Sequence, residues 1–159
     1  MRGYCLILAC CMLLTGCGSG GIAPEAQLAS AKSIYARWND VTMVMTVTET
    51  GCEFAFDTPE TLQTLRLVFD GTVLTADCEG LVAEVSPLFA AGILPLYRGV
   101  LACKVPQWED AGEGVRRISL DGTDFLVYYD PVGGLITRLE VKGAESILAY
   151  QILSCTEKE

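Results

Sequence analysis

From Val41 onward, the sequence alternates apolar and polar residues with a period of two, and short turn sequences interrupt this alternation. Asp70-Gly71 and Asp121-Gly122 are typical of the tight turn of a β-hairpin, and Glu79-Gly80 marks a further turn. Successive side chains of a strand point to opposite faces, so the alternation predicts strands that each bury one face. Most of this chain is therefore expected to fold as an antiparallel sheet.

We predict nine strands in two antiparallel groups, separated by a broken helical segment. Their short connections favour one large sheet that is strongly twisted and curved. The strands are expected at residues 41–48, 52–57, 64–69, 73–78 and 81–85 in the first group, and at 115–120, 123–129, 135–141 and 146–155 in the second.

Before the first strand, residues 24–38 have the pattern of an amphipathic helix. Pro24 stands near its start and Glu25 in its first turn, both of which favour a helix N-terminus. One apolar stripe at helical spacing contains Leu28, Ala31, Tyr35 and Trp38. We expect this stripe to pack on the sheet.

Residues 87–103 form the second helical segment, which is nearly uncharged. Ser86-Pro87 is typical of an N-cap followed by proline in the first turn. Gly92, Pro95 and Gly99 interrupt the segment, so we expect two short helices or a helix and a loop. Because so much apolar surface must be covered, we expect the segment to lie as a lid over the same face of the sheet as the first helix.

The N-terminus has the features of an export signal. Arg2 precedes an uncharged apolar run at residues 5–14, which is too short to span a bilayer. Leu14-Thr15-Gly16-Cys17 resembles the lipobox of bacterial lipoproteins, in which the cysteine thiol receives the lipid. We therefore predict a removable signal at residues 1–16, a lipidated Cys17 in a flexible tether at 17–23, and a single domain at 24–159. The predicted location is the extracytoplasmic face of the cell membrane.

The composition argues against catalysis and against nucleic-acid binding. The chain contains 20 acidic and 11 basic residues, with a net charge of −9, so it lacks the basic surface that phosphate backbones require. It contains no histidine, which removes the commonest general base and metal ligand. No phosphate-binding loop, dinucleotide fingerprint or nucleophile motif is present. We expect no enzymatic activity, no cofactor and no bound metal.

Four cysteines remain in the predicted mature domain: Cys52, Cys78, Cys103 and Cys155. An even number in an exported domain indicates disulfides, and the alternatives are one bridge with two free thiols or four free thiols. The predicted meander separates Cys52 from Cys78 by about 15–20 Å, whereas a bridge needs Cα atoms within about 7 Å. Cys52–Cys78 is therefore the least favoured pair. We expect at least one bridge among the four residues, and Cys103–Cys155 is the pair we favour.

Three stretches resemble the LolA/LolB-like lipoprotein-carrier superfamily, and in particular its small Gram-positive, GerS-like germination lipoproteins. The resemblance covers nearly the whole mature chain. The stretches are Leu14-Thr15-Gly16-Cys17, Phe56-Asp57-Thr58-Pro59-Glu60-Thr61-Leu62, and Tyr129-Asp130-Pro131 running into Ile136-Thr137-Arg138-Leu139-Glu140. The resemblance implies an α+β domain with one strongly curved antiparallel sheet, a half-barrel, whose helices cover one face and enclose an apolar cavity.

Two functions follow from this resemblance. The carriers hold acyl chains in their cavity, so the first is a membrane-anchored module that binds an apolar ligand or acyl chain. The alternative is a non-catalytic envelope or spore-germination lipoprotein that binds a partner protein through a domain with a filled core. For the first function, the expected pocket lies between the sheet and residues 87–103. Its expected lining is Met43, Met45, Phe54, Phe56, Leu65, Leu67, Phe69, Phe89, Ile93 and Leu96.

Overall fold

The computed structural model describes residues 22–86 and 90–157. The predicted signal, Cys17 and Phe89 lie outside these residues. The first part contains α2 (Pro24–Ser30), β1 (Ala31–Trp38), β2 (Val41–Val47), β3 (Cys52–Thr58), the 3-10 turn η1 (Glu60–Leu62), β4 (Leu65–Phe69), β5 (Leu74–Cys78) and β6 (Leu81–Val85). The second contains α3 (Leu94–Cys103), β7 (Glu109–Gly112), β8 (Val115–Leu120), β9 (Thr123–Tyr129), β10 (Ile136–Lys142) and β11 (Ile147–Glu157).

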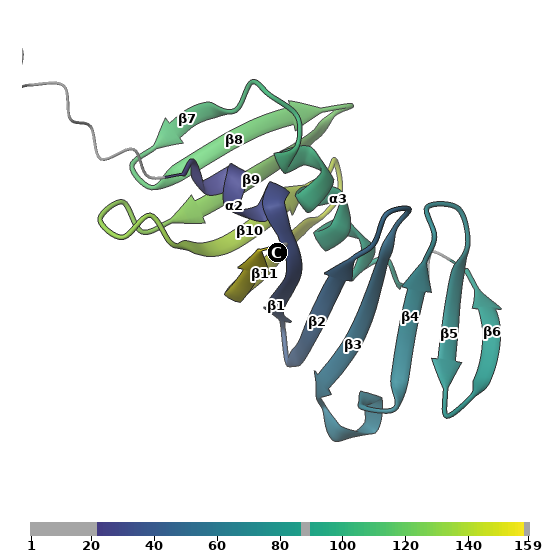
Figure 1. Cartoon of the computed structure of the whole chain (residues 1–159). Helices are drawn as coiled ribbons and strands as arrows, with labels where there is room; N and C mark the ends of the chain where they lie inside the picture. Colours follow the sequence, from purple (N-terminus) through teal and green to yellow (C-terminus); the bar gives the residue numbers. More distant parts are fainter. Residues whose placement is uncertain (1–21, 87–89, 158–159) are drawn as a thin grey trace, which may run out of the picture.

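The described strands form one antiparallel sheet in the order β6-β5-β4-β3-β2-β1-β11-β10-β9-β8-β7 (Figure 1). Each strand pairs with its neighbour along the chain, except where the pairing of β1 with β11 joins the two predicted groups. The α+β class and the single antiparallel sheet are confirmed. The sheet is open, with β6 and β7 at its edges, and it has eleven strands because β1 and β7 join the nine that the alternation predicts.

The predicted helix at residues 24–38 is wrong in its second half. The helix α2 ends at Ser30, and Ala31 already has extended geometry. In β1 the apolar residues Ile34 and Ala36 are fully buried on one face. The strand forms ladders with β2 on one side and with β11 on the other. A helix in its place would leave the inner edges of both neighbours unpaired, and such edges are costly when buried.

Residues 106–114, which lie outside the nine predicted strands and whose polar sequence favours a loop, contain the short strand β7, which pairs with β8 through Glu109 and Arg117. The indole of Trp108, just before β7, is buried. Its Nε1 donates a hydrogen bond to the carbonyl oxygen of Ala102 at 3.2 Å. This bond ties the start of β7 to the last turn of α3.

Within the second helical segment, α3 begins at Leu94, and Pro95 occupies its first turn. Proline is tolerated there because the first-turn amide has no partner within the helix. Pro95 therefore starts α3 and does not interrupt it.

The helices α2 and α3 contact each other and the same face of the sheet, where the two predicted groups of strands meet (Figure 1). The ring of Phe69 in β4 meets that of Tyr97 in α3 edge-to-face, with centroids 6.1 Å apart. In the second group of strands, α3 packs on β10. One continuous hydrophobic cluster fills the space between the helices and this face.

Candidate binding sites

Most side chains expected to line a ligand cavity belong to this hydrophobic cluster. Met43, Met45, Phe54, Phe56, Leu67 and Leu96 are buried, and Leu65, Phe69 and Ile93 are half-buried against them. These residues line neither the groove beside α3 nor the hollow beside the start of α2. Phe56 borders a shallow depression on the other face of the sheet. The structure thus brings the predicted residues together, but as packed core.

The glycines of the second helical segment permit close packing. A Cβ atom on Gly92 would lie 2.0 Å from the ring of Trp38, and one on Gly99 would lie 2.5 Å from a methyl group of Leu139. Both glycines therefore let α3 and the residues before it approach the sheet. In the sequence, glycines within a helical segment favour a lid that opens easily, but here their contacts hold the segment tightly against the sheet.

A groove does adjoin α3, on the side of β8 and β9. Its volume is about 350 Å³, at the lower end of small-molecule sites. Leu101 and Val105 provide exposed apolar surface on the helical side, and Phe125 lies on the opposite wall. The remaining lining residues are Arg98, Ala102, Leu120, Asp121 and Thr123. The groove is the structural counterpart of the predicted pocket, but its sheet wall comes from the second group of strands.

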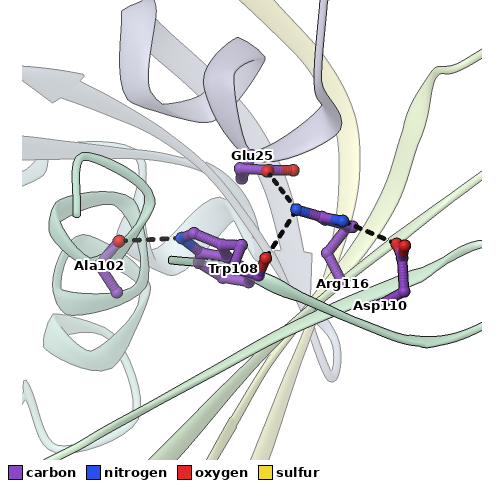
Figure 2. Close-up of polar contacts among 5 residues, drawn as sticks. All are labelled: Glu25, Ala102, Trp108, Asp110 and Arg116. Atoms are coloured by element: carbon purple, nitrogen blue, oxygen red, sulfur yellow. Dashed lines mark hydrogen bonds and ion pairs between the residues drawn. The ribbon is translucent and has the colours of Figure 1, made fainter. Parts of the chain in front are cut away.

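Arg116 in β8 holds the first turn of α2 against the sheet, as Figure 2 shows. Its Nη2 lies 3.1 Å from Oε1 of Glu25 and also donates to the carbonyl oxygen of Trp108 at 2.8 Å. Its Nη1 lies 2.7 Å from Oδ1 of Asp110 in β7. The hydrogen bond to Asp110 is the largest cause of a raised pKa for Arg116, and the Glu25 carboxylate acts in the same direction.

This network leaves two buried atoms without a hydrogen bond among the described residues, Oε2 of Glu25 and Nε of Arg116. Because Glu25 and Arg116 come from α2 and β8, 91 positions apart, sequence spacing gives no sign of their pairing. Its geometry connects elements of the fold and does not form a nucleophile with an adjacent base. We therefore interpret it as a structural clamp.

The four cysteines of the domain are free thiols in the structure. Burial raises the pKa of Cys52 to about 12 and that of Cys155 to about 11. The pKa of Cys103 is also raised, first by burial and then by the nearby charges of Glu25 and Cys155. A thiol with a raised pKa is largely protonated at neutral pH and is a poor nucleophile. Cys52, Cys103 and Cys155 therefore do not have the character of reactive cysteines.

The strand register bears on the choice of disulfide. Cys52 pairs with Phe69, and Phe69 pairs with Leu74, four residues before Cys78. Cys52 and Cys78 therefore lie at opposite ends of their strands, two strands apart. Cys103 ends α3 and lies close enough to Cys155 in β11 to be influenced by its charge. The Cys103–Cys155 bridge stays a prediction for the oxidised protein.

The two edges of the sheet differ in how they are protected. At one edge, β7 is short and acidic, with Glu109 and Asp110, and its ladder with β8 has a register shift. At the other edge, β6 pairs with β5 without any shift, and its first two side chains, Leu81 and Val82, are 80% and 66% exposed. Short strands, charges and bulges blunt an edge against further pairing. By these criteria β7 is better protected than β6, whose one charged residue is Glu84.

Among the described residues, no group of three or more histidine, cysteine, aspartate or glutamate side chains is arranged to hold a metal ion. In the same residues, neither helix has the length and hydrophobicity needed to cross a bilayer. Neither a model of a known protein family nor a curated protein matches this chain.

Sequence reasoning predicted the strand at residues 81–85 but missed its place at an edge of the sheet, and it missed the sheet wall of the groove. A signal for β6 was available in the apolar run Leu81-Val82-Ala83, which follows a turn and lies between Glu79 and Glu84. The wall formed by Phe125 and Leu120 had no such signal, since α3 could have packed on either group of strands.

Proposed function

We propose that this chain is an extracytoplasmic lipoprotein, anchored through Cys17, whose domain binds a partner protein without catalysing a reaction. The order of charge, apolar run, small residues and cysteine at residues 2–17 supports the anchor. The filled interior supports protein binding over storage of a ligand between α3 and the first group of strands. The observation that carries the binding proposal is the edge strand β6, which is regular, exposes Leu81 and Val82, and is less protected than β7.

Addition of a strand to β6 is the binding mode that fits this edge. An edge strand offers unpaired N–H and C=O groups, and an extended peptide can bond to them in register. The register with β5 puts Leu81, Ala83 and Val85 on the same face as Leu74 and Ala76, which is the face that the helices cover elsewhere. An incoming strand with alternating apolar residues would extend this face and cover Leu81.

The experiment is photocrosslinking from single positions in the full-length protein in its native host. A crosslinker at Leu81 should give one defined protein adduct. The matched control is Ile147 in β11, which is also apolar and exposed but belongs to a strand paired on both sides. Val82→Lys should abolish the Leu81 adduct, whereas Ile147→Lys should leave it unchanged. Equal adducts from both positions, or a Leu81 adduct that survives Val82→Lys, would contradict the proposal.

The anchor is tested separately. Replacing Cys17 with Ala should leave the precursor unprocessed or release the protein from the membrane fraction. If the Cys17→Ala protein is still processed and still bound to membranes, the proposed anchor is wrong. The crosslinking result at β6 would stand independently.

The groove beside α3 favours a second function, the binding of an apolar ligand or acyl chain. Its walls are mostly apolar, with Arg98, Asp121 and Thr123 as the polar lining residues. Arg98 forms no ion pair with the described residues, so it is available to an anionic head group despite Asp121 in the same lining. Native mass spectrometry of protein from its own host should then show a bound amphiphile. Leu101→Trp, which fills the groove, should remove that ligand without unfolding the domain.

The LolA/LolB-like or GerS-like relationship is part of the same proposal. We propose that the sheet is a curved half-barrel of that kind, with its helices on the concave face. The open antiparallel sheet and the packing of α2 and α3 on one face support this relationship. An experimental structure of this protein would test the relationship, if its strand order and sheet curvature are compared with those of carriers from that superfamily.

A further inference from the structure

Three exposed apolar side chains lie just before α2 and in the β9–β10 turn. Ile22 is 60% exposed, Leu135 is 67% exposed, and Val132, at 95%, is the most exposed large apolar residue of the described part. Ile22 and Leu135 line the same surface hollow, together with Gln27 of α2. The β9–β10 turn and the start of α2 are therefore neighbours in space.

The β9–β10 turn presents Val132 in a fixed position. The Asp130 carboxylate accepts hydrogen bonds from the backbone N–H groups of Val132 and Gly133, both at 3.0 Å. The N–H of Gly134 donates to the carbonyl oxygen of Asp130 at 2.7 Å, and Gly134 has the positive φ of 68° that favours glycine. The backbone N–H groups of Val132, Gly133 and Gly134 are thus hydrogen-bonded within the turn, and the turn holds the apolar side chain of Val132 exposed to water.

A hydrogen bond fixes this turn to the N-terminal helix. Nε2 of Gln27 donates to the carbonyl oxygen of Gly134 at 2.7 Å. The orientation of the turn is thus set relative to α2, and α2 is itself clamped to β8 through Glu25 and Arg116. Any surface that fixes the start of α2 will meet the turn in a defined orientation.

The length of chain between the proposed anchor and this end limits their separation. Ile22 follows Cys17 by five residues, which span at most about 18 Å when fully extended. A lipid on Cys17 would therefore hold this end of the domain close to the bilayer. The opposite end of β10, where Ile147 follows the next turn, lies a whole strand further away.

We propose that Ile22, Val132 and Leu135 form the face with which the domain rests on the membrane that carries its anchor. This inference depends on the proposed lipidation of Cys17. Ile22, Val132 and Leu135 supply the apolar surface, and among the described residues the hollow is lined by one charged side chain, the acidic Glu157. An uncharged, zwitterionic lipid surface is therefore the expected partner, since basic clusters are what attract proteins to anionic lipid. A domain docked in this way leaves the edge strand β6 accessible to a partner protein, because β6 lies at the opposite end of the strand order from β9 and β10.

The test uses the lipidated protein reconstituted in phosphatidylcholine vesicles, with and without brominated acyl chains that quench tryptophan on contact. Val132→Trp should lose more emission to brominated lipid than the parent protein, whose tryptophans are Trp38 and the buried Trp108. Ile147→Trp is the matched control and should lose no more than the parent. Leu135→Trp repeats the measurement if the Val132 variant folds poorly.

The outcomes separate this inference from the proposed anchor. Mass spectrometry of the reconstituted protein first establishes whether Cys17 carries lipid. If it does, and Val132→Trp and Leu135→Trp are quenched no more than Ile147→Trp, the membrane-facing surface is wrong and the anchor stands. If Cys17 carries no lipid, the anchor is wrong and the inference falls with it. Extra quenching at both turn positions supports the inference.

Discussion

Nη2 of Arg116 lies 3.1 Å from Oε1 of Glu25, and this ion pair joins the eighth strand of the sheet to the first turn of the N-terminal helix (Figure 2). The same guanidinium reaches Asp110 and the backbone of Trp108. One side chain therefore fixes α2, β7 and β8 relative to one another. The position of α2 matters because it sets the orientation of the domain relative to its proposed anchor.

Arg116→Ala should lower the free energy of unfolding by about 1–3 kcal/mol, because it leaves the mostly buried carboxylate of Glu25 without its cation. Arg117→Ala is the matched control, since Arg117 is the exposed neighbour on the opposite face of β8. Urea unfolding of the two variants gives the comparison. Equal losses of stability would mean that the clamp contributes nothing specific.

Leu67→Trp should destabilise the domain by about 1–3 kcal/mol, because Leu67 is only 1% exposed and its surroundings are filled. Leu101→Trp should be tolerated, since Leu101 faces the groove beside α3. Thermal unfolding of both variants measures the difference. If Leu67→Trp were as stable as the parent protein, the interior would contain space that the packed cluster does not indicate, and the cavity-binding function would regain support.

Gly99→Ala tests whether the glycines of α3 serve close packing. In an exposed helix this change stabilises by about 1 kcal/mol, because glycine is a poor helix former. Here the new methyl group would meet Leu139, which is fully buried, so we expect a loss of about 1–3 kcal/mol. Gly143→Ala, where the nearest atoms lie 3.9 Å away, should change stability little. A stabilised Gly99→Ala protein would restore the interpretation of a loosely packed lid.

The nine strands with clear alternation and hairpin turns could be predicted because their pairing is local. The strand β1 could not, since its residues share a helical stripe with Leu28 and its pairing with β11 joins Ala31 to Glu157. The same limit applies to the candidate sites. An alternation of Met43 and Met45 with threonine predicts one buried face equally well for a packed core and for a ligand cavity. Only the three-dimensional packing distinguishes them.

The buried thiols predict how stability depends on alkaline pH. Burial raises the pKa of Cys155 from its ordinary value of 9.0 to about 11, and that of Cys52 from 9.0 to about 12. The unfolded chain releases these protons near pH 9, whereas the folded chain retains them. Their contribution to stability is therefore complete below about pH 9 and is lost as the pH rises through about 11–12.

The same titration distinguishes free thiols from the predicted Cys103–Cys155 bridge, because bridged sulfurs carry no proton. With reductant present, the free energy of unfolding should fall above pH 9, and Cys155→Ala should lessen that fall. Without reductant, the oxidised protein should lose less stability in this range, since only Cys52 of the buried thiols still titrates. Alkylation in denaturant, followed by mass spectrometry, should then label Cys52 and Cys78 but not Cys103 or Cys155. Labelling of all four residues in protein isolated from its native host without reductant would rule the bridge out.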